Sequence, residues 1–222
     1  MFNLFELQLR IKSFPEQYIE NFNYIWKRKN EIESNGNSSL LDEDHRNETY
    51  RRLCSILPKW QTYRPMDYTP CLVTLRDSLL NISEAYNQLR KHTLLDFENI
   101  PNETLQLIWH ELGKTKEPSG EMNEYGSYSV ISICKPLLLI WGQTPAFDSR
   151  VRKNMSQNYR INKYSSNWNL GEWKNIMTQL SRQPNEDKSV IDFIKDKSVE
   201  WYGKNTAIPY GRFLDIYYFE ET

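Results

Sequence analysis

The chain has 222 residues, 39% of them hydrophobic and 14% aromatic, with a formal net charge of −1 and a mean hydropathy of −0.73. The aromatic content excludes a disordered chain, and the balanced charge excludes a strong global field that steers nucleic acid. No uncharged apolar run reaches about 18 residues, so the sequence predicts no membrane span.

Helical periodicity dominates the chain in sequence order. The scarcity of glycine, with 8 residues, also favours helices over turn-rich strands. We expect helices at 15–33, 44–57, 71–97, 101–113, 127–141, 148–155, 170–180 and 189–202. An aromatic tail from 208 to 219 is expected to dock on the core, and strand alternation is conceivable only there. The predicted fold is all-α, an orthogonal multi-helix domain of about eight to ten helices.

The length predicts one domain spanning residues 1–222. The polar stretch 34–39, Ser-Asn-Gly-Asn-Ser-Ser, is the clearest linker in the chain. If the chain forms two helical lobes, they join there.

Cysteine and histidine usage predicts neither a disulfide framework nor a metal site. The three cysteines and three histidines lack Cys-x-x-Cys and His-x-x-x-His spacing. An odd, dispersed set of cysteines fits a reducing compartment, and the N-terminal residues lack the apolar core of a signal peptide. We therefore expect a cytoplasmic protein with no metal and no other cofactor.

Residues 126–155 carry the most specific pattern. An apolar helix at 130–141 is followed by a Gly/Pro loop and then by Asp148, which opens the next helix. Aspartate is among the commonest helix N-caps. A carboxylate held this way is either only a cap or also the working group of a site where positive charge develops.

The run Ala146-Phe147-Asp148-Ser149-Arg150-Val151-Arg152-Lys153 resembles a signature of the helix-hairpin-helix DNA glycosylase superfamily, and Gly126-Ser127-Tyr128-Ser129 occupies the place of its hairpin. The resemblance implies a helix-hairpin-helix-like centre with Asp148 as the catalytic acid. It implies nucleic-acid contacts from Gly126, Ser127, Ser129, Arg150, Arg152 and Lys153. The candidate walls of the base pocket are Tyr125, Tyr128, Trp141, Phe147 and Trp168.

Cleavage of an N-glycosidic bond builds positive charge on the sugar, and a fixed carboxylate stabilises that charge best in a dry pocket. The same acid can orient an attacking water. The base must first leave the stack and enter an aromatic-walled pocket.

Two departures from the superfamily pattern shape this prediction. Members that form a Schiff base carry a hairpin lysine, where this chain has Tyr128, Ser129 and Val130. Lys135 lies about two turns further along, in the middle of the next helix, and does not substitute for that lysine by spacing. The hairpin also has one glycine, Gly126, instead of a Gly-x-Gly. The predicted enzyme is therefore monofunctional, without a lyase step.

Two alternatives stay open. One is a non-catalytic helical protein that binds DNA or a protein partner, for example in genome maintenance or defence against foreign DNA. The other is an unrelated interaction module in which Asp148 is only a cap. Residues 150–212 contain twelve Lys and Arg against six Asp and Glu, but such an excess is usually solvated surface. The tail segment 211–215 is interpreted as an anchor, with an Arg–Asp pair near the site as the alternative.

Overall fold

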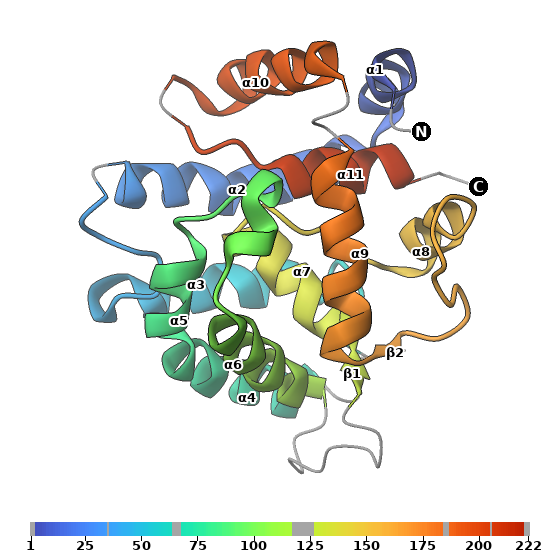
Figure 1. The fold of residues 1–222 in the computed structure, drawn as a ribbon. Coiled ribbons are helices and arrows are strands. Elements are labelled where there is room, and N and C mark those ends of the chain that lie inside the picture. The colour runs from blue at the N-terminus through green and yellow to red at the C-terminus, as the bar shows by residue number, and fades with distance from the viewer. Residues whose placement is uncertain are drawn as a thin grey trace.

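The computed structural model describes residues 3–34, 36–63, 68–116, 127–183, 187–204 and 206–219. The fold is all-α, as the sequence predicts (Figure 1). The α-helices are α1 (Leu4–Ser13), α2 (Glu16–Glu33), α3 (Glu43–Ile56), α4 (Tyr68–Asn81), α5 (Ser83–Leu89), α6 (Asn102–Gly113), α7 (Val130–Ile140), α8 (Ser149–Met155), α9 (Leu170–Arg182), α10 (Lys188–Tyr202) and α11 (Tyr210–Tyr218). Two 3₁₀-helices, η2 (Leu94–Asn99) and η3 (Lys114–Lys116), flank α6.

Helix α7 runs through the centre of the molecule (Figure 1). Its residues are buried with the exception of Ile131, which is half-buried, and α2 and α6 pack against it. This is the behaviour expected of a helix that is apolar on all sides. One connected hydrophobic core, centred on α7, includes side chains from Leu7 near the N-terminus to Tyr218 near the C-terminus.

The predicted linker lies against this core. Ser39 is buried together with Leu40 and Leu41, and its backbone N–H donates to the carboxylate of Asp42 over 2.6 Å. Arg90 donates to the carbonyl oxygen of Gly36 over 3.0 Å. The end of the stretch is therefore packed at Ser39, while Gly36 and Asn37 are exposed.

The segment 71–97 is not one long helix, as its leucine pattern suggested. Helix α4 ends at Asn81, and Ile82 leaves helical geometry with φ −91° and ψ 1° before α5 begins. The Asn81 side chain donates to the carboxylate of Glu111 on α6. A capping box between Thr93 and Asp96 then starts η2. Leu75, Leu79, Leu89 and Leu94 of these pieces are buried in the same core, whereas Leu80 is 50% exposed.

Other local expectations are refined. The aromatic tail packs on the core, as expected, and it forms helix α11. The N-terminal residues, for which no element is predicted, form α1, capped by the Asn3 side chain. Residues Tyr128–Ser129 form a short strand, β1, antiparallel to β2 (Asn167–Trp168), so the helix expected at 127–141 begins at Val130. The helix-hairpin-helix centre stays a prediction, and Gly126 lies outside the described residues.

Within the described part of the chain, no helix combines the length and the apolarity that crossing a membrane requires.

Replacing Gly211 by alanine is expected to weaken the fold. A Cβ atom there would lie 2.2 Å from the backbone carbonyl carbon of Gln143 and from the amide nitrogen of Thr144, so α11 would have to move off the loop that it packs against. We expect a loss of roughly 1–3 kcal/mol in the free energy of unfolding, measured by urea denaturation.

The matched control is Gly171→Ala in the first turn of α9, where a Cβ atom meets only the side-chain oxygen of Asn169, at 3.2 Å. Alanine is favoured over glycine in helices by about 1 kcal/mol, which offsets a small shift of the capping Asn169 oxygen, so this variant should lose less stability than Gly211→Ala. Equal stability of the two variants would contradict the close packing of α11.

Candidate functional site

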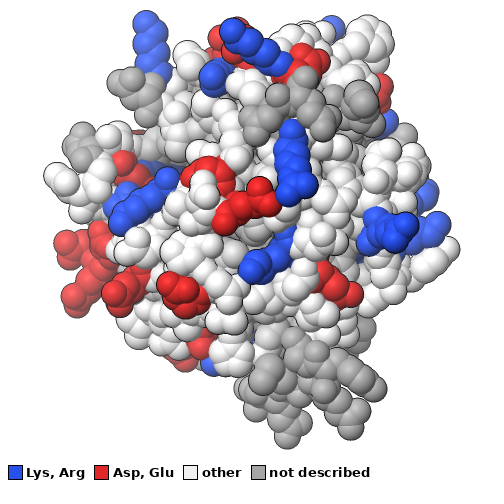
Figure 2. Space-filling model, viewed as in Figure 1, with Lys and Arg blue, Asp and Glu red and all other residues white. Residues whose placement is uncertain are grey.

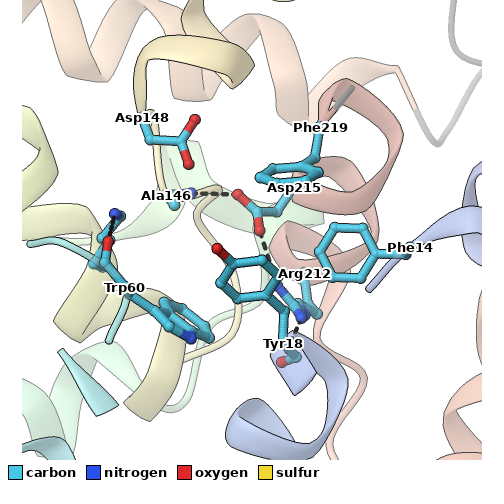
Figure 3. Close-up of a pocket in the computed structure, with 9 residues that line it drawn as sticks. Phe14, Tyr18, Trp60, Ala146, Asp148, Arg212, Asp215 and Phe219 are labelled. Carbon is cyan, nitrogen blue, oxygen red and sulfur yellow. Dashed lines mark hydrogen bonds and ion pairs between the residues drawn. The ribbon is translucent and has the colours of Figure 1, made fainter. Parts of the chain in front are cut away.

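A small cavity lies where α7, α11, the loop before α8 and the junction of α1 and α2 meet (Figure 3). It is lined by Phe14, Tyr18, Trp60, Lys135, Ala146, Asp148, Arg212, Asp215 and Phe219. The chain therefore brings two carboxylates, two cations and four aromatic rings to one place. The cavity volume is about 30 Å³, which is room for one or two water molecules.

Asp148 has two roles in the geometry of this cavity. It is the N-cap of α8, and its Oδ1 accepts hydrogen bonds from the backbone N–H groups of Arg150 and Val151, both over 3.0 Å. The cap that the sequence predicts is confirmed, and it is common to both interpretations of Asp148. Figure 3 shows the same carboxyl group directed toward Asp215 across the cavity. Because capping engages one oxygen, the other is left to act in the cavity.

Lys135 enters the cavity from the middle of α7. Its side chain is 6% exposed, and Nζ donates to the carbonyl oxygen of Trp60. Burial lowers the pKa of Lys135, and the charge of Arg152 lowers it further, against the opposing effects of Asp148 and Asp215. Lys135 lies in the middle of α7, away from the hairpin position as its spacing indicates, and it lines the same cavity as Asp148.

Asp215 and Arg212 form a buried ion pair on α11, with 2.9 Å between Oδ2 and Nη1. The other carboxylate oxygen of Asp215 accepts from the backbone N–H of Ala146 over 2.8 Å. Burial raises the pKa of Asp215 to about 6, and Asp148 adds to this while Arg212 opposes it. The pair is thus both an anchor and part of the cavity wall, which combines the two interpretations of segment 211–215.

The guanidinium of Arg212 also forms a hydrogen bond to a backbone carbonyl and contacts three aromatic rings. Nη2 donates to the carbonyl oxygen of Tyr18 over 2.9 Å, and Cζ lies 4.8 to 5.6 Å from the ring centroids of Phe14, Phe22 and Trp60. Such cation–π contacts are strongest where water is excluded. They fix two of the aromatic walls relative to the charged groups.

Arg152 does not face solvent, contrary to its predicted role in phosphate binding. It is 4% exposed, and Nη1 donates to the carbonyl oxygen of Phe147 over 2.6 Å. Phe147 adopts a positive φ of 50°, a conformation that non-glycine residues rarely take. Arg152 therefore supports the loop that presents Asp148.

Of the three cations that are predicted to contact nucleic acid, Arg150 and Lys153 are exposed. Arg150 lies 5.1 Å from the ring centroid of Phe219, one of the cavity walls. Figure 2 shows Lys and Arg side chains over α8 at the right and a group of Asp and Glu at the left, near α3. This face carries both signs of charge, as the net charge leads one to expect.

None of the predicted base-pocket aromatics with a described position lines this cavity. Tyr128 is buried, and its hydroxyl hydrogen-bonds the Nδ1 atom of His110. Trp141 is core, and its indole N–H donates to the carbonyl oxygen of His92. Phe147 and Trp168 pack on each other with ring centroids 5.0 Å apart. Tyr125 lies outside the described residues.

The predicted hairpin contacts are also placed away from the cavity. Ser129 is buried in the β1–β2 pair, where its hydroxyl accepts from Nζ of Lys116, and Ser127 is half-buried just before β1. Neither lines the cavity that contains Asp148. A phosphate-binding hairpin is therefore not supported by the described residues of segment 126–129.

Sequence reasoning missed the aromatic side chains that do surround Asp148: Phe14, Tyr18, Trp60 and Phe219. They come from the first 60 residues and from the end of α11, so no local motif contains them. Lys135 is marked in the sequence, because it interrupts an otherwise apolar helix and lysine is almost never fully buried unless it is paired.

Among the described residues, no group of three or more His, Cys, Asp and Glu side chains is placed to hold a metal ion. No protein-family model matches the chain, and neither the curated proteins nor the solved structures contain a match.

The raised pKa of Asp215 predicts a pH-dependent stability. The folded state holds this proton more tightly than the unfolded chain, whose ordinary value is 3.8. The stabilising contribution is therefore complete below about pH 4 and is lost as the pH rises through 6. From pH 4 to 7 the wild type should lose about 2 kcal/mol relative to Asp215→Asn in urea denaturation. A difference between the two proteins that does not change with pH would contradict the raised pKa.

Proposed function

We propose that this protein is a divergent DNA-glycosylase-like enzyme that cleaves an N-glycosidic bond at the Asp148 cavity. The observation that carries the proposal is the placement of a helix-capping carboxylate in a sheltered cavity with aromatic walls. A carboxylate held rigidly in such surroundings is suited to stabilise an oxocarbenium-like transition state, because little reorganisation is needed when the charge develops.

Under this proposal, Asp148 and Asp215 have different roles. Asp148 faces the sugar with the oxygen that does not cap α8, and it orients the attacking water. Both oxygens of Asp215 are engaged, by Ala146 and by Arg212, so Asp215 acts by positioning the loop before α8 and not as a proton donor. Bond cleavage in this form needs no covalent intermediate and is monofunctional.

The cavity must open before it can admit a base. Its volume of about 30 Å³ is far below the ~300 Å³ of pockets that enclose organic ligands. Phe219 is the wall best placed to move, because it lies beyond the last turn of α11 and its ring packs edge-on against Phe14. Arg150 contacts the Phe219 ring. A phosphate that draws Arg150 outward would release this wall as DNA binds.

The closed cavity favours one other function, a non-catalytic protein that binds DNA or a protein partner through the same fold. Under this alternative Asp148 is a cap, and the charged cluster only holds α7, α8 and α11 together. The two functions differ in product formation, because only the enzyme releases a free base from a duplex.

Asp148→Asn should abolish most base release while leaving the fold intact. Asparagine caps helices about as well as aspartate, but it carries no charge to stabilise the transition state. We expect a loss of roughly 10²-fold or more in the rate of base release from duplexes with modified or mismatched bases. The unfolding free energy should stay within about 0.5 kcal/mol of the wild type.

The matched control is Asp187→Asn, because Asp187 caps α10 in the same manner, with its side chain accepting from the N–H of Ser189. It does not line the cavity, so base release should be unchanged. Undiminished release by Asp148→Asn would remove Asp148 from the mechanism. Absence of release by the wild type from every duplex would favour the non-catalytic alternative.

DNA binding should depend on the exposed cations of α8. We expect the variant Arg150→Ala/Lys153→Ala to bind duplex DNA more weakly. The logarithm of its association constant should fall less steeply with the logarithm of the salt concentration, by up to about 2 in the magnitude of the slope. Fluorescence anisotropy over a range of salt concentrations measures both. Lys195→Ala, an exposed residue of α10, should leave the slope unchanged. Equal slopes for all three proteins would exclude α8 from the DNA contact.

A further inference from the structure

We propose that the segment 149–168 is a docking surface for single-stranded nucleic acid, with Tyr164 as the side chain on which one base stacks. This interaction goes beyond the bond cleavage at Asp148 and requires no step of that reaction. A strand with unpaired bases offers both features that the segment can bind, a row of phosphates and the open faces of the bases.

The first support is the charge of this part of the chain. Residues 149–171 contain five Lys and Arg and no Asp or Glu. Arg152 is buried. The other four cations are exposed, namely Arg150, Lys153, Arg160 and Lys163. The ion pairs among the described residues involve none of these four side chains. Because no described carboxylate neutralises them, these cations attract a polyanion.

The second support is an aromatic ring that the fold leaves uncovered. Tyr164 is 87% exposed, the largest exposed fraction among the large hydrophobic side chains of the described residues. Its loop is held by Asn162, whose Oδ1 accepts from the backbone N–H groups of Tyr164 and Ser165 over 3.0 and 3.2 Å. Nζ of Lys163 lies 5.1 Å from the centroid of the Tyr164 ring. A base that stacks on this ring therefore brings its phosphate close to a cation.

A second exposed tyrosine shows what distinguishes this site. Tyr24 on α2 is 52% exposed, and Cζ of Arg52 lies 4.2 Å from its ring centroid. This arginine is paired with Glu48 over 2.6 Å, and the groove beside Tyr24 contains two further glutamates as well as its cations. Carboxylates repel phosphates at such short range. The surroundings of Tyr164 contain a cation without a paired carboxylate, and those of Tyr24 do not.

The third support is a hollow in the same loop region that can receive the edge of a neighbouring base. Its volume is about 90 Å³, and its lining includes Trp168, Asn162, Asn167 and Asn175. A side-chain amide carries both donors and an acceptor, as the edge of a base does. Glu172 also lines the hollow, but its carboxylate is engaged in the capping box that starts α9. The volume is far below the ~300 Å³ of pockets that enclose organic ligands, so only an edge enters.

The position of the segment leaves it open to a strand. Figure 1 shows the chain between α8 and β2 running along the outside of the molecule. Arg150 and Lys153 on α8 begin this segment, and Arg160 and Lys163 continue it toward Tyr164. A strand that follows the four cations thus arrives at the exposed ring.

Oligonucleotide binding to the full chain tests stacking separately from charge. The probes are fluorescent oligothymidylate and an abasic strand with the same number of phosphates, and fluorescence anisotropy gives both affinities. We expect the wild type to bind oligothymidylate roughly tenfold more tightly than the abasic strand. Tyr164→Ala should remove most of this preference, whereas Tyr164→Phe should keep it, because a phenyl ring also stacks. Equal affinity of the wild type for the two strands would overturn the proposal.

The matched control is Tyr24→Ala, which removes the other exposed tyrosine that has a cation against its ring. It should leave both affinities unchanged, and a loss as large as that of Tyr164→Ala would overturn the role of Tyr164. Arg160→Ala/Lys163→Ala should bind both strands more weakly. The logarithm of its association constant should fall less steeply with the logarithm of the salt concentration, by up to about 1.4 in the magnitude of the slope. A slope equal to that of the wild type would overturn the phosphate contact.

Duplex DNA separates this proposal from the function proposed above. Tyr164→Ala should bind a duplex and release its bases as the wild type does, because paired bases do not offer their faces to the ring. Equal weakening of strand and duplex binding in this variant would overturn stacking. Base release by a wild type that does not prefer oligothymidylate over the abasic strand overturns only the docking surface. The preference without base release overturns only the enzyme.

Discussion

The buried pair of Arg212 and Asp215 is the interaction on which the cavity depends. Two charges removed from water cost several kcal/mol each unless their remaining hydrogen-bonding groups are satisfied. Here Asp215 accepts a hydrogen bond from the backbone N–H of Ala146, and Arg212 donates one to the carbonyl oxygen of Tyr18. Helix α11 is thereby fixed to the loop before α8 on one side and to α2 on the other. Loss of either partner would leave an uncompensated charge at the junction of all three elements.

The same constraint prepares the electrostatics of the cavity. The loop that Asp215 holds by Ala146 carries Asp148 two residues further on, and the cap of α8 fixes the orientation of that carboxylate. Lys135 faces both acids from the central helix. Charged groups that are rigid before a ligand arrives are worth more than mobile ones, because the protein does not reorganise during the reaction. The cavity volume of about 30 Å³ is too small for a base, and the aromatic side chains that line the cavity limit this volume.

The sequence predicted helices and caps, which depend on neighbouring residues, but it did not predict contacts between residues that are far apart in the chain. The helices 15–33 and 101–113 and the cap at Asp148 follow from periodicity and end signals within one or two turns. The aromatic walls do not, because Trp60 and Phe219 are brought to Asp148 by tertiary packing. Arg152 was misassigned for a related reason: in a basic turn only packing decides which cation points inward, and here the positive φ of Phe147 aims its carbonyl at Arg152.

Stability alone gives a weak reason for this arrangement. A lysine in the middle of an apolar helix and an aspartate with a raised pKa both oppose folding at neutral pH, and apolar residues of similar volume often stabilise a core that contains buried ion pairs. The cap of α8 engages one oxygen of Asp148 and requires none of the other charged groups. That a cap, a buried amine and an ion pair meet around one small hollow instead is typical of a site whose charges are kept for a ligand.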